Sequence, residues 1–421
     1  MRPAVSSRRR ITSLLTPKTR PSEPSSSSLQ SRGRAGCWAT SGSLSNATVG
    51  VPSTQQQEAD YNLVAKKINS EGGAGCRKIV MSFYEVNPVS AANAQQSCLD
   101  IAQAQPYIVV DSGALTNVGA GNCIPQHHVL LASSYLTPDD LKTYHPYVLD
   151  IGGNAQDAFG TGFTALKQLG YFSAAKGFKK LGVIYHTCAS GAQALEQAAL
   201  AAAKVPAKDV SYFNLACPAG QEDTSASMEQ AVLQFKSAGV TDVTEEAVGD
   251  WGLFTQVAQQ QGYTPHYLFT DSAAAASNFT GPDAPNPTNF DGTINIVEGG
   301  YGEATTPGFK ASASTKACDA IYAAGGQPNV YKQLDGYGGV VCEYLWFVQG
   351  LLNHASTVTP TAQVSSMHKI GTLAFPYPAA PINFSTSPSG SAYGTVEWRA
   401  IYYHSSCKCW QVPDATFHQA S

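Results

Sequence analysis

The chain has 421 residues and a formal net charge of −4 at pH 7, and only 13% of its residues are charged, about half the usual share of roughly 25%. This length can bury the cores of two domains, and the hydrophobic fraction of 43% is that of a globular protein. The charge is unevenly placed, because residues 1–45 hold seven Arg, one Lys and one Glu, a formal +7. The rest of the chain is acidic, which gives no reason to expect a nucleic-acid partner.

Residues 1–45 resist a structural interpretation. They contain twelve Ser and no sustained apolar run, so we expect a disordered leader. They lack the apolar core of a secretory signal, and their Arg-rich, Ser-rich and acid-poor composition is that of an organelle transit peptide. The alternative, which we favour, is a mis-assigned start that hides the true signal. Cys37 follows no lipobox, and no run of about 18 apolar residues predicts a transmembrane helix.

Ten cysteines are many for a cytosolic protein, and no Cys-x-x-Cys pair indicates zinc. We therefore expect disulfides and an oxidising compartment. Proximity in the sequence favours three pairs, Cys98–Cys123, Cys188–Cys217 and Cys318–Cys342, although sequence alone does not fix connectivity. For Cys407 and Cys409 we expect disulfides to other cysteines.

Beyond the leader, strands alternate with helices. The expected strands are Thr48–Val51, Lys78–Tyr84, Tyr107–Val110, Val129–Ala132, Lys180–Tyr185, Val210–Asn214, Val240–Val243, His266–Thr270, Thr293–Val297 and Thr395–Tyr403. The expected helices are Gln55–Ser70, Ser90–Gln103, Phe159–Ala175, Gly191–Lys204, Ser225–Ala238, Gly252–Gln261, Thr315–Ala324 and Tyr337–His354. Such alternation predicts parallel sheets built from βαβ units, in two α/β lobes. Ligands of such sheets bind beyond the carboxyl ends of the strands.

Catalytic and cofactor motifs are absent. The chain has no phosphate loop, no H-E-x-x-H helix and no G-x-S-x-G elbow, so we expect no enzyme, no cofactor and no metal site. Gly160-Thr-Gly162 faintly resembles a dinucleotide fingerprint but lies in a helical pattern. His127 and His128 have no acid or thiol at ligand spacing and are interpreted as loop residues. Asn46, Asn278 and Asn383 open N-x-[ST] triplets, which matter only in a eukaryotic secretory route.

One segment carries a family resemblance. Ile68-Asn69-Ser70-Glu71-Gly72-Gly73, followed by a turn and Arg77-Lys78-Ile79, resembles the Ile-Asn-x-x-Gly-Gly pattern of type I periplasmic-binding proteins. These are the substrate-binding subunits of branched-chain-amino-acid-type ABC importers. The likeness continues through Tyr84, Pro88 and the Ala-rich stretch that follows, and through 179–185, 231–240, 254–262 and 337–352. It covers about residues 48–415.

The resemblance implies two Rossmann-like lobes joined by hinge strands, with the ligand between them. We expect the first lobe to comprise residues 46–153 and 300–365, and the second lobe 154–299 and 366–421. The pattern residues themselves are expected to be scaffold that does not contact ligand.

The resemblance also implies a ligand site. Ser112 and Gly113 match a first carboxylate-binding loop, Ser133 and Ser134 match a second, and Asp271 matches the acid that binds the ligand's ammonium. Each serine could equally cap a loop, and Asp271 could cap a helix. Ser190 stands where the family often has an aromatic residue. Trp251 and Tyr337 could supply the stacking surface instead, or could pack in the core. The loop Pro52–Gln57 is shorter than in the family.

These inferences together predict an extracytoplasmic solute-binding protein, periplasmic or tethered at the cell surface. It would capture an amino acid, amide, short peptide or aromatic acid and deliver it to ABC permease subunits. The alternatives are a ligand-sensing receptor domain of the same fold and a doubly wound α/β enzyme. The lack of a transmembrane segment counts against the receptor domain, and the lack of catalytic motifs counts against the enzyme.

Overall fold

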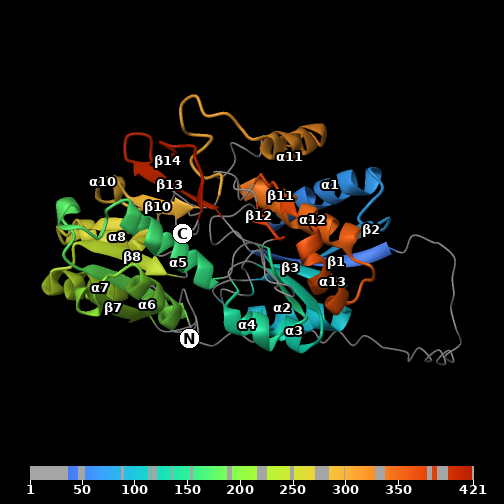
Figure 1. Ribbon diagram of the computed structural model, residues 1–421, viewed down its shortest axis with the longest axis horizontal. Coiled ribbons are helices and arrows are strands. Elements are labelled where there is room, and N and C mark those ends of the chain that lie inside the picture. Colours follow the sequence, from blue (N-terminus) through green and yellow to red (C-terminus); the bar gives the residue numbers. More distant parts are fainter. Residues whose placement is uncertain are drawn as a thin grey trace, which may run out of the picture. The chain divides into compact units, whose positions relative to one another are not determined.

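The computed structural model describes residues 37–45, 53–86, 90–111, 115, 121–133, 136–151, 155–186, 192–215, 225–246, 251–270, 284–297, 299–327, 337–376, 382–385 and 397–419 (Figure 1). Predictions on Thr48–Val51 and on the Cys188–Cys217 pair lie outside these residues. The described parts form a parallel sheet and a second, mainly parallel sheet, each flanked by helices, together with a two-stranded ladder.

The first sheet has five parallel strands in the order β2-β1-β3-β4-β5. They are β1 (Cys37–Ser45), β2 (Lys78–Val86), β3 (Ile108–Asp111), β4 (Leu130–Ser133) and β5 (Val148–Asp150). Strands β3, β4 and β5 are buried along their whole length. This matches their continuous apolar runs, which are typical of parallel strands covered on both faces.

Helices cover the two faces of the first sheet. One apolar cluster joins the sheet to α1 (Thr54–Ser70), α11 (Ala313–Ala324), α12 (Tyr337–His354) and α13 (Pro360–Ser366). A second cluster on the other face joins α2 (Ala91–Ala104), α3 (Cys123–Gln126) and α4 (Pro138–Thr143). Helices α1 and α12, which are far apart in the sequence, pack side by side (Figure 1). The small ladder β11 (Thr372–Leu373) and β12 (Ile382–Asn383) also joins the first cluster.

The segment from α1 to β2 shows why its sequence pattern is scaffold. Ile68 is buried in the core, and the Asn69 amide bonds both main-chain groups of Ile79, its Oδ1 accepting from N–H at 2.7 Å and its Nδ2 donating to C=O at 2.8 Å. Gly73 has a φ of +82°, and a Cβ there would lie 2.0 Å from the carbonyl oxygen of Arg77. The pattern therefore requires glycine for the turn and asparagine to hold the helix against the strand.

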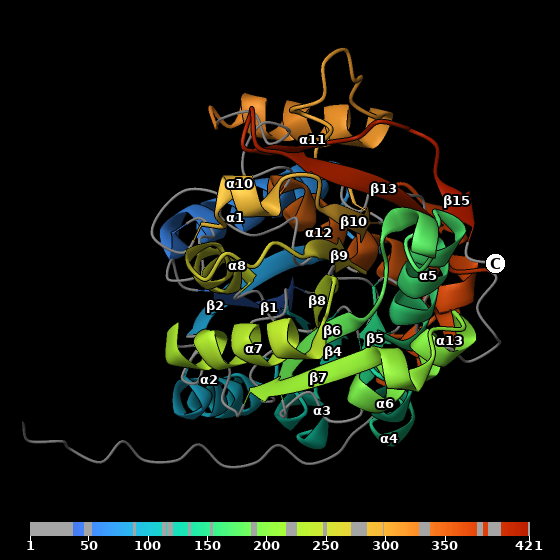
Figure 2. The ribbon, with the colours of Figure 1, turned by 90° about the vertical axis from the view of Figure 1, so that its left-hand side faces the viewer.

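The second sheet has eight strands, of which β6 to β10 are parallel in the order β7-β6-β8-β9-β10. They are β6 (Leu181–His186), β7 (Val210–Leu215), β8 (Asp242–Glu246), β9 (His266–Phe269) and β10 (Ile294–Val297). The sheet continues with antiparallel β13 (Glu397–His404), β14 (Cys409–Gln411) and β15 (His418–Gln419). Figure 2 shows β13 beside β10, although about a hundred residues separate them in the sequence.

Two further clusters form the core of the second lobe. One contains residues of α5 (Ala155–Gln168) and α6 (Ala192–Ala202), and the other contains residues of α7 (Ser225–Ala238), α8 (Trp251–Gln260) and α10 (Pro287–Phe290). Short 3₁₀ turns occupy Ala174–Lys176, Ala207–Asp209 and Met367–Lys369. Helix α5 ends seven residues earlier than expected, because the chain turns at Gly170, which has a φ of +81°.

A buried ion pair ties the second sheet to the segment that follows β10. The Arg399 guanidinium donates to Glu303 Oε1 at 2.6 Å and to the carbonyl oxygen of Gly299 at 2.9 Å. The guanidinium also lies over the ring of Phe417, 4.6 Å from its centroid. Both charged side chains are buried.

The division of the chain between the lobes differs from the expectation at one boundary. Met367, Ile370, Phe375 and Phe384 belong to the core of the first lobe, whereas the expected boundary assigned residues after 365 to the second. The chain returns to the second sheet only at β13. We therefore propose that the last crossing between lobes lies beyond Phe384.

The first strand corrects the interpretation of the leader. Cys37–Ser45 was assigned to the disordered leader, yet it is β1, an interior strand of the first sheet that is paired with both β2 and β3. Its sequence, CWATSGSLS, contains small polar residues and glycine, which are poor indicators of a strand. Position between two strands, rather than local propensity, makes this segment extended.

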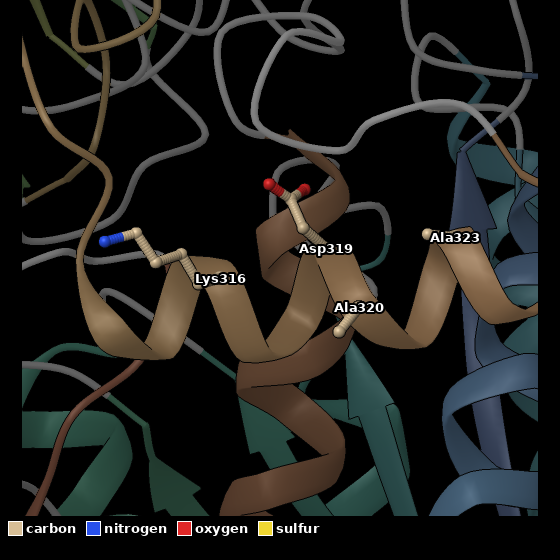
Figure 3. A pocket seen from close by; sticks show the side chains of 4 residues that line it. All are labelled: Lys316, Asp319, Ala320 and Ala323. Atoms are coloured by element: carbon tan, nitrogen blue, oxygen red, sulfur yellow. The ribbon is translucent and has the colours of Figure 1, made fainter.

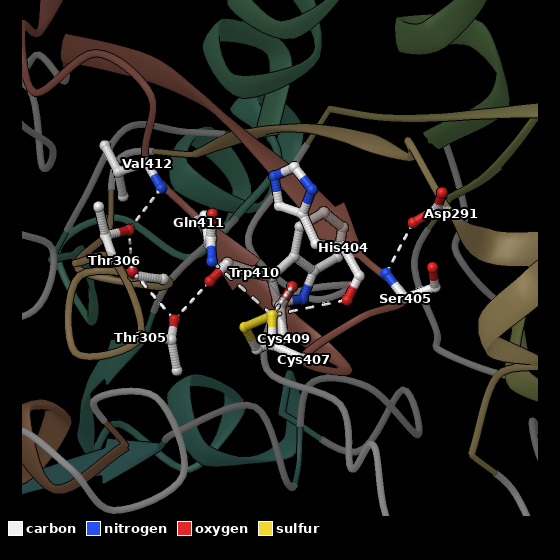
Figure 4. The surroundings of a disulfide bond; sticks show 11 residues. Asp291, Thr305, Thr306, His404, Ser405, Cys407, Cys409, Trp410, Gln411 and Val412 are labelled. Atoms are coloured by element: carbon white, nitrogen blue, oxygen red, sulfur yellow. Dashed lines mark hydrogen bonds between the residues drawn. A yellow bond between two sulfur atoms is a disulfide. The ribbon is translucent and has the colours of Figure 1, made fainter.

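The disulfides follow the predictions in part. Cys98–Cys123 and Cys318–Cys342 are bonded as expected. The expectation for Cys407 and Cys409 was wrong, because these two bond to each other across the turn between β13 and β14 (Figure 4). Beside them the hydroxyl of Thr305 donates to Trp410 O, and that of Thr306 accepts from Val412 N at 2.8 Å.

Candidate functional site

Each sheet has a topological switch point at the carboxyl ends of its strands. In the first sheet β1 lies between β2 and β3, and in the second β6 lies between β7 and β8. The chain leaves neighbouring strands in opposite directions at such points, and open parallel sheets bind ligands in the crevice there. The carboxyl ends of the strands are therefore the candidate site in each lobe.

Three buried polar side chains end adjacent strands of the first sheet. Asp111 ends β3, Ser133 ends β4 and Asp150 ends β5, and none of the three is exposed. Ser133 lies opposite Asp150 in the register, and its hydroxyl donates to the carbonyl oxygen of Asp111 at 3.3 Å. We call Asp111, Ser133 and Asp150 the first-sheet edge, meaning the edge formed by the carboxyl ends of the strands and not an outer strand.

Both carboxylates of the first-sheet edge accept main-chain N–H groups. Asp111 Oδ1 accepts from Leu115 N at 3.1 Å, and Asp150 Oδ2 accepts from Leu136 N at 2.8 Å. Leu115 and Leu136 are themselves buried in the cluster shared with α2 and α3. Each carboxylate thus holds a point in the chain just beyond a strand end.

The returning helix α12 also reaches this edge. The Tyr344 hydroxyl donates to the carbonyl oxygen of Asp111 at 3.0 Å, a bond that spans 233 residues of sequence. Tyr344 is buried in the first core cluster. The first-sheet edge is therefore fixed from both β4 and α12.

The second sheet carries a different polar group. Glu196, on α6, is 1% exposed, and neither of its carboxylate oxygens has a hydrogen-bond partner among the described residues. Burial raises the pKa of Glu196 to about 8. Tyr185, one residue before the end of β6, lies close enough to interact electrostatically with Glu196, and its side chain bonds that of Asn214 on β7. A proton on Glu196 is the form that such burial favours.

The weak dinucleotide-like pattern has a structural explanation. Gly162 lies within α5, and a Cβ there would come 2.4 Å from the Cβ of Thr270, which follows β9. Glycine is needed at this position so that the helix can approach the strand end. Gly160, on the same helix, has nothing within 4 Å of such a Cβ.

Most of the predicted ligand residues lie outside the described part of the chain. These are Ser112, Gly113, Ser134, Ser190 and Asp271. Trp251 and Tyr337 begin α8 and α12, but their side chains are outside the description. Ser133 is described, and its hydroxyl is used within the protein. The sequence prediction missed Asp111, Asp150 and Glu196, although an acid directly after a buried strand was a usable signal for the first two.

Within the described residues, no group of three or more His, Cys, Asp or Glu side chains could hold a metal ion. None of the described helices is both long and apolar enough to span a membrane. A shallow surface pocket lies along α11, lined by Lys316, Asp319, Ala320 and Ala323 (Figure 3). These side chains come from a single helix.

No protein-family model and no curated protein matches this chain. Solved structures do resemble it. A periplasmic binding protein type 1 from Bordetella pertussis Tohama I is 13% identical over 91% of this chain and 99% of its own, with a TM-score of 0.62. The branched-chain amino acid transporter substrate-binding protein LivJ from Streptococcus pneumoniae, in complex with isoleucine, is 14% identical over 91% of this chain and 100% of its own, with a TM-score of 0.62. A solute-binding protein of an ABC transporter from R. palustris, in complex with 4-hydroxybenzoate, is 10% identical over 91% and 97%, with a TM-score of 0.63.

These similarities identify the fold. The chain has the fold of type I periplasmic-binding proteins, with two parallel sheets flanked by helices, and the predicted fold class is confirmed. The similar structures are described as binding proteins rather than as enzymes.

Proposed function

We propose that this protein is an extracytoplasmic solute-binding protein that captures a small polar molecule between its lobes and delivers it to an ABC importer. The observation that carries the proposal is the similarity to solute-binding proteins over 91% of this chain and nearly the full length of theirs. Disulfides in both lobes support an oxidising compartment. Binding without chemistry agrees with the absence of catalytic motifs in the sequence.

We propose that the ligand carries a carboxylate. The ligands of two similar proteins, isoleucine and 4-hydroxybenzoate, share this group and little else. Hydroxyls and main-chain N–H groups at a strand end can bind a carboxylate through charge-assisted hydrogen bonds. We assign this role to Ser112, Gly113 and Ser134, whereas the buried hydroxyl of Ser133 donates to Asp111 O within the protein.

We expect the other residues of the proposed site to determine which carboxylate-bearing ligand is bound. Asp271 would bind an α-ammonium group if the ligand is an amino acid. Ser190, Trp251 and Tyr337 would form the walls around the side chain or ring of the ligand. An aromatic acid would need no ammonium partner, so Asp271 separates these two ligand classes.

A thermal-shift panel of leucine, isoleucine, 4-hydroxybenzoate and amino-acid amides tests the function. A ligand present at a hundred times its Kd stabilises the folded protein by about 2.7 kcal/mol, which is easily measured. If an amino acid raises the Tm of the wild type, Asp271→Ala should abolish that increase. A panel in which no compound raises the Tm would count against a solute-binding role.

A further inference from the structure

We propose that the Cys407–Cys409 disulfide is an exchange site for low-molecular-weight thiols, at which the bond opens and closes while the fold persists. A thiol would modify Cys407 reversibly, through a mixed disulfide. The site lies in the turn between β13 and β14 (Figure 4), apart in the sequence from every residue assigned to the proposed ligand site. It therefore goes beyond the proposed function and does not depend on it.

The three disulfides of the described residues differ in their exposure to solvent. Four buried cysteines, none of them more than 7% exposed, form two of the bonds, Cys98–Cys123 and Cys318–Cys342. In the third bond Cys407 is exposed, while its partner Cys409 is 8% exposed. Exchange requires a thiolate to reach a sulfur atom. Among these six cysteines, Cys407 is therefore the one that the folded protein offers to a thiol.

The three bonds also differ in the length of chain that they close. The two buried bonds span 25 and 24 positions of sequence, whereas Cys407 and Cys409 are two positions apart. A disulfide stabilises a protein largely by restricting the unfolded chain, and it does so less for a shorter loop. Opening the Cys407–Cys409 bond should therefore cost the fold the least stability of the three.

Contacts other than the disulfide hold the hairpin of β13 and β14 in place. The register pairs three residues of β13 with three of β14. Trp410, the residue after Cys409, is fully buried in the core of the second lobe. The Thr305 hydroxyl donates to Trp410 O, and Thr306 Oγ1 accepts from Val412 N at 2.8 Å. These contacts remain when the disulfide opens, so we expect the hairpin to stay folded.

The residues beside the two sulfurs favour the opened form. Lys408, between the cysteines, has a φ of +52°, a left-handed conformation that is unfavourable for a residue with a side chain. Opening the small ring allows Lys408 to leave this conformation. Its positive charge also stabilises a neighbouring thiolate. Gln411 Nε2 donates to Cys407 Sγ at 3.8 Å and can donate to the thiolate that forms there.

The exchange consists of two substitutions at sulfur. In the first, a thiolate RS⁻ attacks Cys407 Sγ, a bond forms between these two sulfurs, the Cys407–Cys409 bond breaks, and Cys409 leaves as a thiolate. In the second, another RS⁻ attacks the sulfur of the bound RS group, so that RSSR forms and Cys407 leaves as a thiolate. In total two RSH are oxidised to RSSR, and the protein disulfide is reduced to two thiols. The reverse sequence closes the bond again.

Differential labelling of the full chain under native conditions tests the site. Free thiols, among them exposed Cys76, are first blocked with N-ethylmaleimide, which is then removed. Reduced glutathione is the probe, and the thiols that it releases are labelled with iodoacetamide and located by peptide mass spectrometry. Cys407 and Cys409 should acquire label about tenfold or more faster than the four buried cysteines, which need local unfolding before they react.

Three results of this labelling would overturn the proposal. Equal rates at all three bonds would mean that exchange follows unfolding and not exposure. Label at Cys407 and Cys409 that appears in urea but not under native conditions would mean that the folded protein shields the bond. Blocking of these two residues in the first step, before glutathione is added, would mean that they form no disulfide.

Lys408→Glu tests the electrostatic part of the proposal. The substitution removes a cation beside the sulfurs and adds an anion that repels the attacking thiolate, so labelling at Cys407 and Cys409 should slow about threefold or more. Lys208→Glu makes the same change at another exposed lysine of the second lobe and is the matched control, with a rate within about 1.5-fold of wild type. Equal slowing in both variants would contradict the role of Lys408.

Serine variants separate an exchange site from a structural bond. The double variant Cys407→Ser with Cys409→Ser should lower the Tm by less than about 5 °C, because the bond closes so little chain. The double variant Cys98→Ser with Cys123→Ser should lower the Tm by more. A decrease at Cys407 and Cys409 as large as that of the buried pair would make their bond structural and would overturn the proposal.

Discussion

The parallel strands of the two lobes share one order, but particular buried polar side chains in the two lobes differ in whether they are paired. In the first lobe Asn69, Asp111 and Asp150 each bond main-chain groups of a neighbouring segment. In the second lobe Glu196 and Asn295 are buried with no hydrogen-bond partner among the described residues. A satisfied buried polar group is neutral or stabilising, whereas an unsatisfied one carries its full desolvation cost. The three named side chains of the first lobe thus fix main-chain geometry, whereas Glu196 and Asn295 of the second lobe carry the cost of their burial.

Glu303 is a buried acid of the second lobe that does have a partner. Breaking its ion pair gives the largest expected loss of stability. Glu303 is paired with Arg399, and Arg399→Met would leave its carboxylate buried without the guanidinium. Breaking a buried pair by removing one partner costs about 3–5 kcal/mol. We expect that loss in urea unfolding at pH 7.

The pH dependence of this loss of stability follows from the direction in which the pKa of Glu303 is shifted. Burial raises the pKa of Glu303, and the Arg399 guanidinium opposes this. Without the guanidinium the pKa should rise further, so protonation relieves the penalty at low pH. The deficit of Arg399→Met should therefore be smaller at pH 5 than at pH 8. The double variant with Glu303→Leu should recover much of the loss, and a single variant as stable as wild type would contradict the argument.

Asn69→Leu should give the next largest effect, in the first lobe. The substitution removes two hydrogen bonds and leaves both main-chain groups of Ile79 unpaired. The expected loss is about 2–3 kcal/mol, measured by chemical unfolding. Ser70→Ala, which removes one exposed bond to Lys67 O, is the control and should cost far less. A ligand that stabilises the wild type should bind the Asn69→Leu variant with unchanged affinity, because this segment is scaffold.

The sequence was sufficient for the segment around Asn69 and for most of the α/β alternation. Ile68, Asn69 and Gly73 act through contacts within about ten residues, so their pattern is visible locally. The start of the helix near Ser90 was likewise predicted, and the Ser90 side chain caps this helix by accepting from Asn93 N.

Long-range contacts account for what the sequence did not show. Strand β1 depends on pairing with β2 and β3, because its own residues favour no strand. The first-sheet edge depends on register between β4 and β5 and on Tyr344, 233 residues away from Asp111. No local pattern encodes such pairings. The Cys407–Cys409 bond is a different case, because its two residues lie two positions apart and the bond spans a single tight turn.

Glu196→Gln tests whether Glu196 is protonated in the folded protein, because the substitution should change how stability depends on pH. Because the folded-state pKa is raised from 4.5 to about 8, the folded protein retains a proton that the unfolded chain releases across that window. Wild-type stability should therefore fall as pH rises from 5 to 8, by at most ~1.4 kcal/mol per pH unit from this group.

The glutamine variant removes this dependence. Its stability relative to wild type should increase from pH 5 to pH 8 by up to ~3–4 kcal/mol, because any fixed cost of burying the amide is the same at both pH values. Thermal unfolding at both pH values measures the difference. Glu229→Gln makes the same chemical change at an exposed glutamate on α7 and is the control, with an expected change of less than about 0.5 kcal/mol in the free energy of unfolding. A constant difference for Glu196→Gln would mean that the carboxyl is not retained in its protonated form.

Asn295→Leu should give the smallest change in unfolding free energy. It also tests most directly the contrast between a paired and an unpaired buried asparagine. Asn295 lies on β10 between Phe269 and Ile401, within the apolar face of the second sheet, and both its amide atoms are buried without partners among the described residues. Leucine has a similar shape, so the substitution should cost nothing and can gain about 1 kcal/mol in unfolding free energy. The same chemical change at Asn69 should lower stability, so the two variants should differ in sign. If Asn295→Leu destabilises as Asn69→Leu does, the amide of Asn295 has an essential partner, and the two lobes handle buried polarity alike.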